Sequence, residues 1–269
     1  MIMKVSRLAQ EITLKELSLG YPGKVLMENL NAVLPSGKIS VILGGSGCGK
    51  STLLRHILGL NIPVSGEIFL GDTNLTELKD EEELRLIRTR MGVLFQDGAM
   101  LGSLTLGENV ALPLQEHTDL PDVIIEEVVQ MKLRMVGLGE FTHYYPNQLS
   151  GGMRKRAGLA RAMVMDPTTL LCDEPSSGLD PITAADLDQL ILKLKETFNV
   201  TIVVVTHDLD SLFNIADHVV VLHQGRCLYQ GDLDGLRESE DQYLIDFLER
   251  RPTMIDDSMA RSVKFRSRL

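Results

Sequence analysis

The chain has 269 residues, of which 44% are hydrophobic and 24% are charged, and its formal net charge is −10. This length and composition are typical of a folded protein with a substantial core, and they exclude a disordered chain. The acidic balance argues against nucleic acid as the main partner, because binding the phosphates of a duplex needs clustered lysine and arginine.

The three cysteines are Cys48, Cys172 and Cys227, too few and too scattered for a disulfide framework or a zinc cluster. This usage favours a reducing compartment. Residues 1–14 lack the apolar stretch of a secretory signal, and no run reaches the roughly eighteen apolar residues of a membrane span. We therefore expect a cytosolic chain, whose work at a membrane would require a partner that spans it.

Short apolar runs alternate with helical patterns along the chain, which predicts a layered α/β fold. Residues 11–20 alternate as a half-buried strand, whereas residues 38–45 and 168–174 are continuous apolar runs, as in strands buried on both faces. A third such run, 201–207, is rich in β-branched residues. Residues 218–231 hold two strand-like runs around a Gln-Gly pair, which predicts a hairpin.

From about Asp97 to Met165 the pattern is mainly helical, which predicts a helical subdomain inserted into the α/β core. The sequence changes again after Glu249, because residues 250–269 contain six basic and two acidic residues. We expect a domain over 1–249 and a basic tail over 250–269. The tail either frays into solvent, contacts a second acidic subunit or touches anionic lipid head groups.

The first candidate site is GGSGCGKST, between the apolar run and a helical pattern. It matches the phosphate-binding loop G-x-x-x-x-G-K-[ST] in the context that this motif requires. The glycines let backbone N–H groups surround a β-phosphate, Lys50 supplies positive charge, and Ser51 offers a hydroxyl to Mg²⁺. The predicted nucleotide-binding residues are Gly44, Gly45, Ser46, Gly47, Cys48, Gly49, Lys50, Ser51 and Thr52.

Polar residues follow three other apolar runs. In LLCDEP, Asp173 is placed to orient Mg²⁺ and Glu174 to polarise the attacking water, although paired acids after a strand also occur in solvated loops. His207 is either structural or a sensor of the γ-phosphate, and Gln96 can touch Mg²⁺ and water. Tyr21 can stack on adenine or remain a surface aromatic in a glycine-rich turn.

A second glycine pair occurs in LSGGMRKR, residues 149–156, at the start of a basic helical stretch. Glycines at a helix N-terminus let an anion approach free N–H groups and the positive end of the helix dipole. The chain already has a phosphate loop, so these residues raise the question of whose phosphate they meet.

These segments, in this order, resemble the ATP-binding subunit of ABC transporters over nearly the whole chain. The resemblance is carried by Tyr21, GGSGCGKST, Gln96, LSGGM, LLCDEP, SSGLDP and the pair Thr206 and His207. It implies an α/β P-loop NTPase ABC nucleotide-binding domain, with a RecA-like core, an N-terminal antiparallel β subdomain and an inserted α-helical subdomain. It further implies ATP and Mg²⁺ as cofactors, Glu174, His207 and Gln96 as catalytic residues, and Ser51, Gln96 and Asp173 at the metal.

The resemblance also implies that two copies pack head to tail. Ser150, Gly151 and Gly152 of one copy then close over the ATP held by the other, and Asp180 of SSGLDP lies across the dimer interface. Met153 stands where many relatives carry glutamine, so the hydrogen bond of that amide is absent. We still expect activity, because the serine and both glycines are present.

Residues 91–121 lie where this family receives a helix of its membrane partner. With SGGM and GLDPIT, they resemble the ATPases of the Mla and MCE lipid-transport systems. The implied partners are an MlaE-type permease and an MCE-domain protein, with a small cytosolic STAS-type subunit as a further candidate. The implied role is phospholipid transport, as a peripheral subunit on the cytoplasmic face of the inner membrane. The alternatives are an importer of amino acids or other small solutes, and a non-transport ABC ATPase.

Overall fold

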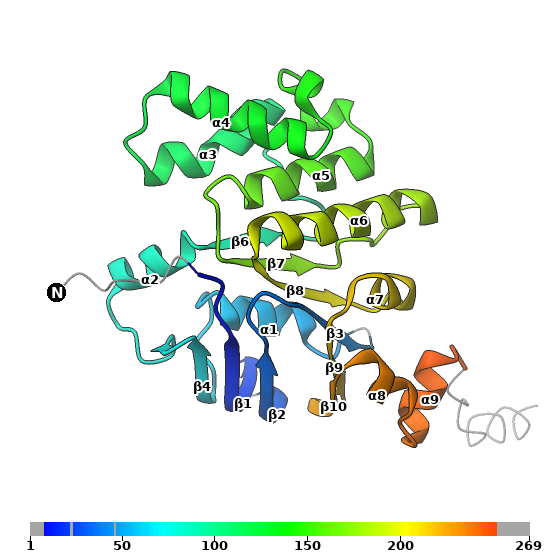
Figure 1. Cartoon of the computed structure of the whole chain (residues 1–269). Helices are drawn as coiled ribbons and strands as arrows, with labels where there is room; N and C mark the ends of the chain where they lie inside the picture. The colour runs from blue at the N-terminus through cyan, green and yellow to red at the C-terminus, as the bar shows by residue number, and fades with distance from the viewer. Residues whose placement is uncertain (1–7, 22–23, 46, 252–269) are drawn as a thin grey trace, which may run out of the picture. The chain divides into compact units, whose positions relative to one another are not determined.

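The computed structural model describes residues 8–21, 24–45 and 47–251 (Figure 1). The chain divides into two compact units, residues 1–233 and 234–269. The first unit contains two β-sheets and a group of helices, and the second contains two short helices. The predicted α/β class is confirmed.

A four-stranded antiparallel sheet occupies the N-terminal part of the first unit. Its order is β2 (Lys24–Leu34), β1 (Ile12–Tyr21), β4 (Ser65–Leu70) and β5 (Thr73–Asn74). The β1–β2 register shifts between Leu14 and Gly20, and both strands contain a residue with positive φ, Glu16 at 47° and Asn29 at 51°. Such bulges increase the local twist of a sheet.

The six-stranded sheet has the order β10 (Arg226–Gly231), β9 (His218–His223), β3 (Ile39–Gly44), β8 (Thr201–Thr206), β7 (Thr169–Asp173), β6 (Met91–Leu94). All neighbouring pairs are parallel except β9 with β10. The predicted hairpin is confirmed, because His223 pairs with Arg226 around Gln224 and Gly225, whose φ angles of 48° and 75° are both positive as in a type I′ turn.

Helix α1 (Lys50–Ile57) lies between the two sheets. Its Leu53 and Ile57 are fully buried in a core that contains Leu14 of β1 and Val203 of β8. Figure 1 shows α6 (Pro181–Phe198) and α7 (Leu209–Ile215) on the other face of the six-stranded sheet. Covering both faces explains why the parallel strands are apolar throughout. Helix α2 (Glu81–Arg88) precedes β6.

Three helices form a separate core between β6 and β7: α3 (Leu106–His117), α4 (Asp122–Met135) and α5 (Gly151–Ala162). Two 3₁₀ turns, η1 (Gly139–Phe141) and η2 (Pro146–Gln148), connect α4 to α5. Thr105 begins α3 with a capping box to Glu108, which satisfies donors at the helix start. The predicted helical character is confirmed, and the subdomain boundaries at about 97 and 165 stay a prediction.

The second unit contains most of α8 (Leu233–Arg237) and all of α9 (Gln242–Leu248). Asp241 caps α9 by accepting hydrogen bonds from the Tyr243 and Leu244 amides. Arg251 pairs with Asp246 and Glu249 within this unit. The rest of the basic tail lies outside the described residues, and the predicted domain boundary after residue 249 stays a prediction.

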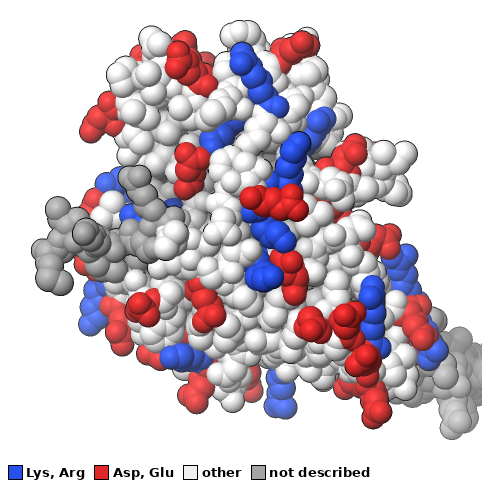
Figure 2. All heavy atoms as spheres, viewed as in Figure 1, with Lys and Arg blue, Asp and Glu red and all other residues white. Residues whose placement is uncertain are grey.

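In the part of the chain that the structure describes, no helix has the length and apolar character needed to cross a membrane. Figure 2 shows acidic and basic side chains interleaved on one face of the molecule. The described residues on this face therefore form no large patch of a single charge sign.

Candidate functional site

The candidate site forms where four parallel strands end. Strands β3, β8, β7 and β6 run side by side, so the residues that follow them meet at one edge of the sheet. Ligands of open α/β sheets bind outside the carboxyl ends of the strands. The sheet order therefore brings together the phosphate loop after β3, Glu174 after β7 and His207 after β8.

The phosphate loop runs from the last residue of β3 into α1, with Gly44 and Gly45 at its start and Lys50, Ser51 and Thr52 in the first turn of the helix. Gly49 occupies the N-cap with φ 99°, a left-handed conformation that favours glycine. Among the residues that the structure describes, no side chain caps this helix end. Its first N–H groups and the positive end of its dipole can therefore bind an anion. The predicted Ser46 lies outside the described residues.

Lys50 is almost fully buried at this edge, with 7% of its surface exposed. Its Nζ donates to the carbonyl oxygens of Gly44, at 2.8 Å, and Gly45, at 3.3 Å. The same Nζ lies 3.7 Å from Glu174 Oε1. These contacts hold the Lys50 ammonium between the phosphate loop and Glu174. A positive charge in this position can stabilise the negative oxygens of a bound phosphate.

Ser51 and Asp173 place two oxygen ligands side by side. Ser51 Oγ donates to Asp173 Oδ1 at 2.8 Å. Burial raises the pKa of Asp173, while the hydrogen bond from Ser51 opposes the rise. Mg²⁺ prefers hard oxygen ligands and is commonly held by one or two carboxylates with substrate phosphates, so this pair fits the metal that the sequence predicts.

Glu174 follows β7 in the left-handed region, with φ 48°. Thr206 Oγ1 donates to its carboxylate at 3.3 Å, and His207 Nδ1 lies 2.9 Å from a carboxylate oxygen. The His207 side chain is 63% exposed, so it faces outward where a phosphate can reach it. The structure thus joins the predicted acid and the predicted histidine directly. Thr206 is an additional contact that was predicted only as part of the TH motif.

Two predicted site residues are not brought into this network. Gln96 is exposed two residues after the end of β6, and within the described residues no hydrogen bond joins it to Ser51 or Asp173. The Tyr21 backbone pairs with Lys24, but its side chain lies outside the described residues. Their roles at the metal and the adenine stay predictions.

The second glycine pair begins helix α5. Ser150 is the N-cap, and its Oγ accepts a hydrogen bond from the Met153 amide at 3.2 Å. A Cβ on Gly152 would lie 2.5 Å from Thr183 Cγ2, so a larger residue would require the Thr183 side chain at the start of α6 to shift. A Cβ on Gly151 would make an ordinary contact, 3.7 Å from Leu179 Cδ2. Met153 packs against the core of the helical group.

Asp180 is the N-cap of α6. It accepts hydrogen bonds from the Thr183 hydroxyl at 2.6 Å and from the Ile182 and Thr183 amides at 3.1 Å each. These bonds, above all the one from the Thr183 side chain, lower the pKa of Asp180. Helix capping accounts for its geometry within one chain, and its predicted place across a dimer interface stays a prediction.

The site contains one residue that the sequence did not predict. Lys155 of α5 is 5% exposed, and its Nζ donates to three carbonyl oxygens of the loop after Glu174. A lysine within MRKR suggests a solvated face. The helical spacing could have indicated burial instead, because Lys155 lies three residues after buried Gly152 and four residues before buried Leu159, on the same face of α5.

A groove of about 600 Å³ lies between β6, α2, α3 and α5. Its apolar wall includes Phe95 and Leu101, which are 41% and 47% exposed. Arg85, Arg161 and His117 also line it. Several lining residues belong to the segment that the sequence predicted to receive a membrane partner: Val93, Phe95, Ala99, Leu101, Leu112, Pro113 and His117.

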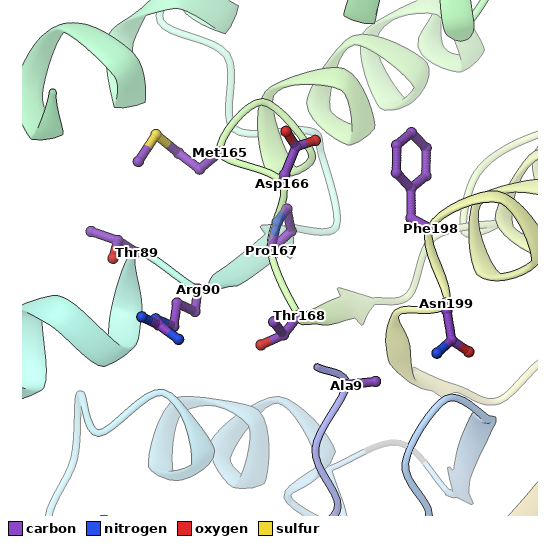
Figure 3. A pocket seen from close by; sticks show the side chains of 9 residues that line it. All are labelled: Ala9, Thr89, Arg90, Met165, Asp166, Pro167, Thr168, Phe198 and Asn199. Carbon is purple, nitrogen blue, oxygen red and sulfur yellow. The ribbon is translucent and has the colours of Figure 1, made fainter. Parts of the chain in front are cut away.

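A second hollow, of about 490 Å³, lies at the opposite edge of the six-stranded sheet (Figure 3). Its lining is Ala9, Thr89, Arg90, Met165, Asp166, Pro167, Thr168, Phe198 and Asn199. In Figure 3 Asp166 and Phe198 extend to the same side. Lys132 Nζ lies 2.5 Å from Asp166 Oδ1 and 4.9 Å from the centre of the Phe198 ring. None of the predicted site residues that the structure describes lines this cavity.

The family profile described as ABC transporter matches residues 27–177. Mycobacterial proteins named probable ribonucleotide transport ATP-binding protein mkl are 41% identical in Mycobacterium leprae and 42% in Mycobacterium tuberculosis, over 89% and 84% of this chain. The chain spans 69% and 63% of their length. The intermembrane phospholipid transport system ATP-binding protein MlaF of Haemophilus influenzae is 40% identical over 88% of this chain and 90% of its own.

The chain is also similar to solved structures of ATP-binding cassettes. The dimeric structure of a post-hydrolysis state of an ATP-binding cassette bound to ADP and Pi superposes with a TM-score of 0.76 at 32% sequence identity. The match covers 82% of this chain and 98% of that chain.

Proposed function

The chain belongs to the ABC transporter family and is an ABC-type ATPase, and we propose that it powers the transport of phospholipid between membranes. The observation that carries the ATPase part is the arrangement of Glu174 with Lys50, Thr206 and His207 beside the Ser51–Asp173 pair. The cargo is supported by the 40% identity to the phospholipid ATPase over most of both chains.

In this proposal each group at the strand ends has one task. The uncapped start of α1 and Lys50 bind the phosphates of ATP. Ser51 and Asp173 would hold Mg²⁺, which would neutralise negative charge on the phosphates. Glu174 orients and polarises the attacking water, while Thr206 and His207 fix its carboxylate and His207 senses the γ-phosphate.

Two copies of the chain complete the site. Dimeric cassettes occur among the similar structures, and the start of α5 has glycines but no lysine within its first turn. We place Ser150, Gly151 and Gly152 of one copy over the ATP of its partner, with Asp180 at the interface between them. ATP then favours the closed pair and hydrolysis favours the open one, because ATP binds the two states differently.

The groove lined by Phe95 and Leu101 is the docking site for a helix of a membrane permease. Its apolar wall suits the apolar face of such a helix, and Arg85 and Arg161 suit an acidic residue at its edge. An MlaE-type permease with an MCE-domain protein is the proposed assembly, which holds the chain at the cytoplasmic face of the membrane. A small STAS-type subunit is a further candidate partner.

The cargo test is purification of the tagged chain from its own cells, followed by identification of its partners and by lipid extraction. We expect a permease, an MCE protein and glycerophospholipid, and we expect loss of the chain to change phospholipid distribution between membranes. The mkl relatives make ribonucleotide or another small solute the rival cargo. A permease fed by a soluble solute-binding protein, without lipid, would contradict the phospholipid proposal and leave the ATPase assignment intact.

Docking has its own test within the same purification. Leu101→Asp places a charge on the apolar wall, and we expect it to reduce recovery of the permease about tenfold or more while ATP binding stays normal. Leu60→Asp, at another exposed leucine that is 54% exposed and does not line the groove, is the matched control. Equal loss in both variants would contradict docking in this groove.

A further inference from the structure

Lys155 connects helix α5 to the loop that begins with Glu174. Its Nζ lies 2.7 Å from the Pro175 oxygen, 2.5 Å from the Ser177 oxygen and 3.3 Å from the Glu174 oxygen. An ammonium group has three N–H donors, and here they converge on three backbone acceptors of a single turn. The side chain is therefore fully used by this one loop.

This arrangement is costly for a residue whose role is stability alone. Burial lowers the pKa of Lys155, and Asp97 and Glu174 offset only part of that effect. Within the described residues no carboxylate lies within ion-pair distance of its Nζ. An apolar side chain of similar length would avoid the desolvation of a charge. The charged side chain of Lys155 is explained by the three carbonyl groups of the Glu174 loop that it holds in place.

The loop that Lys155 holds contains Glu174, the residue proposed to activate the attacking water. Glu174 has a φ of 48°, a conformation that side-chain-bearing residues adopt only when their surroundings impose it. Its amide donates to the Val205 oxygen at 2.9 Å, and Ser177 closes the turn by donating to the Glu174 oxygen at 3.2 Å. Lys155 fixes the same turn from the opposite side, through the carbonyl groups.

The rest of α5 contacts two other segments that respond to ligands in the proposed function. Ser150 and Gly152 form its start, which closes over the partner's ATP. Near its end, Arg161 donates to the Gly98 and Ala99 oxygens at 2.8 and 2.7 Å, in the loop that follows Gln96 and lines the docking groove. One rigid helix thus touches the glycine pair, the groove and the Glu174 loop.

We propose that Lys155 is a positioning residue that ties Glu174 to helix α5 of its own chain, so that movement of α5 sets the orientation of the water-activating carboxylate. This inference rests on the proposed function, because it assumes that α5 closes over the ATP of a partner copy. Its consequence is coupling in both directions: the helix that completes one ATP site also adjusts the acid of the other.

Removing the ammonium should impair turnover and spare ATP binding. We expect Lys155→Met to lower kcat on the order of tenfold to a hundredfold with KM for ATP within about twofold, since displacement of a reacting group reduces rate without removing substrate contacts. Lys155→Arg keeps charge and donors and should recover most of the rate. Lys132→Met removes another lysine that is nearly fully buried, at 1% exposure, and should leave both constants unchanged.

Dimers of two differently tagged full-length chains show which site the lysine serves. The reference pairs a wild-type chain with Glu174→Gln, which leaves only the wild-type chain's acid active. Adding Lys155→Met to the wild-type chain should lower turnover as strongly as in the uniform dimer. Adding it instead to the Glu174→Gln chain should leave turnover at the reference level. The reverse pattern would overturn the proposal, because Lys155 would then shape the glycine pair and not Glu174.

Hydrogen exchange tests the tether without any turnover. In the full-length chain, Lys155→Met should speed exchange of the amides of Ser177 and Leu179, which are bonded within this turn, and leave the α3–α4 core as protected as in the wild type. Unchanged exchange at these two amides would overturn the inference. Absence of ATPase activity in the wild-type chain would contradict the proposed function instead, and the exchange result would still decide the role of Lys155.

Discussion

Two helices of this chain begin with glycines at functional positions, and their ends differ in one respect. Helix α1 begins after Gly49, and no side chain of the described residues caps its N–H groups, whereas α5 begins after Ser150, whose oxygen already accepts from Met153. The first end is open to a phosphate and has Lys50 beside it. At the second end Ser150 occupies one of the N–H groups, and no lysine stands in the first turn, so this end suits a site whose phosphate loop belongs to another chain.

The same contrast extends to the carboxylates near each helix. Asp173 and Glu174 lie against Ser51 and Lys50 of α1. Asp180, the acid near α5, is used to cap α6. A helix start becomes a catalytic site only where cation, metal ligand and base gather around it, and in this chain they gather at α1.

The largest effect should come from the base at the α1 edge. Glu174→Gln keeps the size of the side chain and removes its ability to take a proton, so steady-state hydrolysis should fall about 100-fold or more while ATP still binds. The variant should accumulate with ATP as a closed dimer in light scattering. Glu196→Gln, on an exposed position of α6, serves as the control. Near-normal hydrolysis by Glu174→Gln would contradict the assignment of Glu174 as the base that activates water.

A smaller effect separates the two helix starts by affinity. Lys50→Ala removes the charge beside the phosphate loop, so we expect affinity for ATP to fall about tenfold or more in the isolated chain. Ser150→Arg should leave that affinity unchanged and still block turnover, because it acts only when two copies close. Calorimetry or a fluorescent ATP analogue gives both constants. If Lys50→Ala and Ser150→Arg lost ATP affinity equally, the proposal that only the start of α1 binds ATP within one chain would be contradicted.

Replacing Asp173 should raise the stability of the fold while it removes activity. Burial places its folded-state pKa above the unfolded value, so the ionised carboxylate lowers stability, and this penalty disappears as pH falls through the folded pKa and then the unfolded pKa. Asp173→Asn should therefore unfold at a higher temperature than wild type at pH 7, and the gap should narrow toward pH 4. The variant should also lose Mg²⁺-dependent hydrolysis. A lower melting temperature at pH 7 would contradict this account.

The smallest effect concerns the cap of α5. Ser150→Ala removes the acceptor for Met153 and should cost about 1 kcal/mol of stability. Ser150→Asp keeps an acceptor, so its melting temperature should stay near that of the wild type. Its charge would nevertheless repel the partner's phosphate and lower turnover. If Asp restored both stability and turnover, Ser150 would be a cap alone.

The sequence predicted the parallel strands and the groups at their ends because both signals are local. Runs such as 201–207 are apolar enough to require burial on two faces, and the edge that they share follows from their being parallel. Strand β2 gives no such signal. Its buried Met27, Leu30 and Leu34 have helical spacing, and only pairing with β1, shifted by bulges, makes it a strand.

The rest of the site depends on contacts that no local pattern contains. The bond from Thr206 to Glu174 spans 32 positions, and the bonds from Lys155 to the Glu174 loop span 19 to 22. A basic run such as MRKR indicates a solvated helix face until the neighbouring loop is placed. The positive φ of Glu174 occurs in a residue with contacts of the same kind, to Val205 of β8 and to Lys155 of α5.

The measurement that tests the shared site most directly is ATP turnover by dimers of two tagged chains. Pairing Ser150→Arg with Lys50→Ala places both changes in one composite site and leaves the other intact. Pairing the Ser150→Arg/Lys50→Ala double variant with a wild-type chain uses the same two changes but damages both sites. We predict turnover in the first pair, near half that of wild type, and almost none in the second. Turnover only in the second pair would mean that each chain completes its own site, and it would contradict the account.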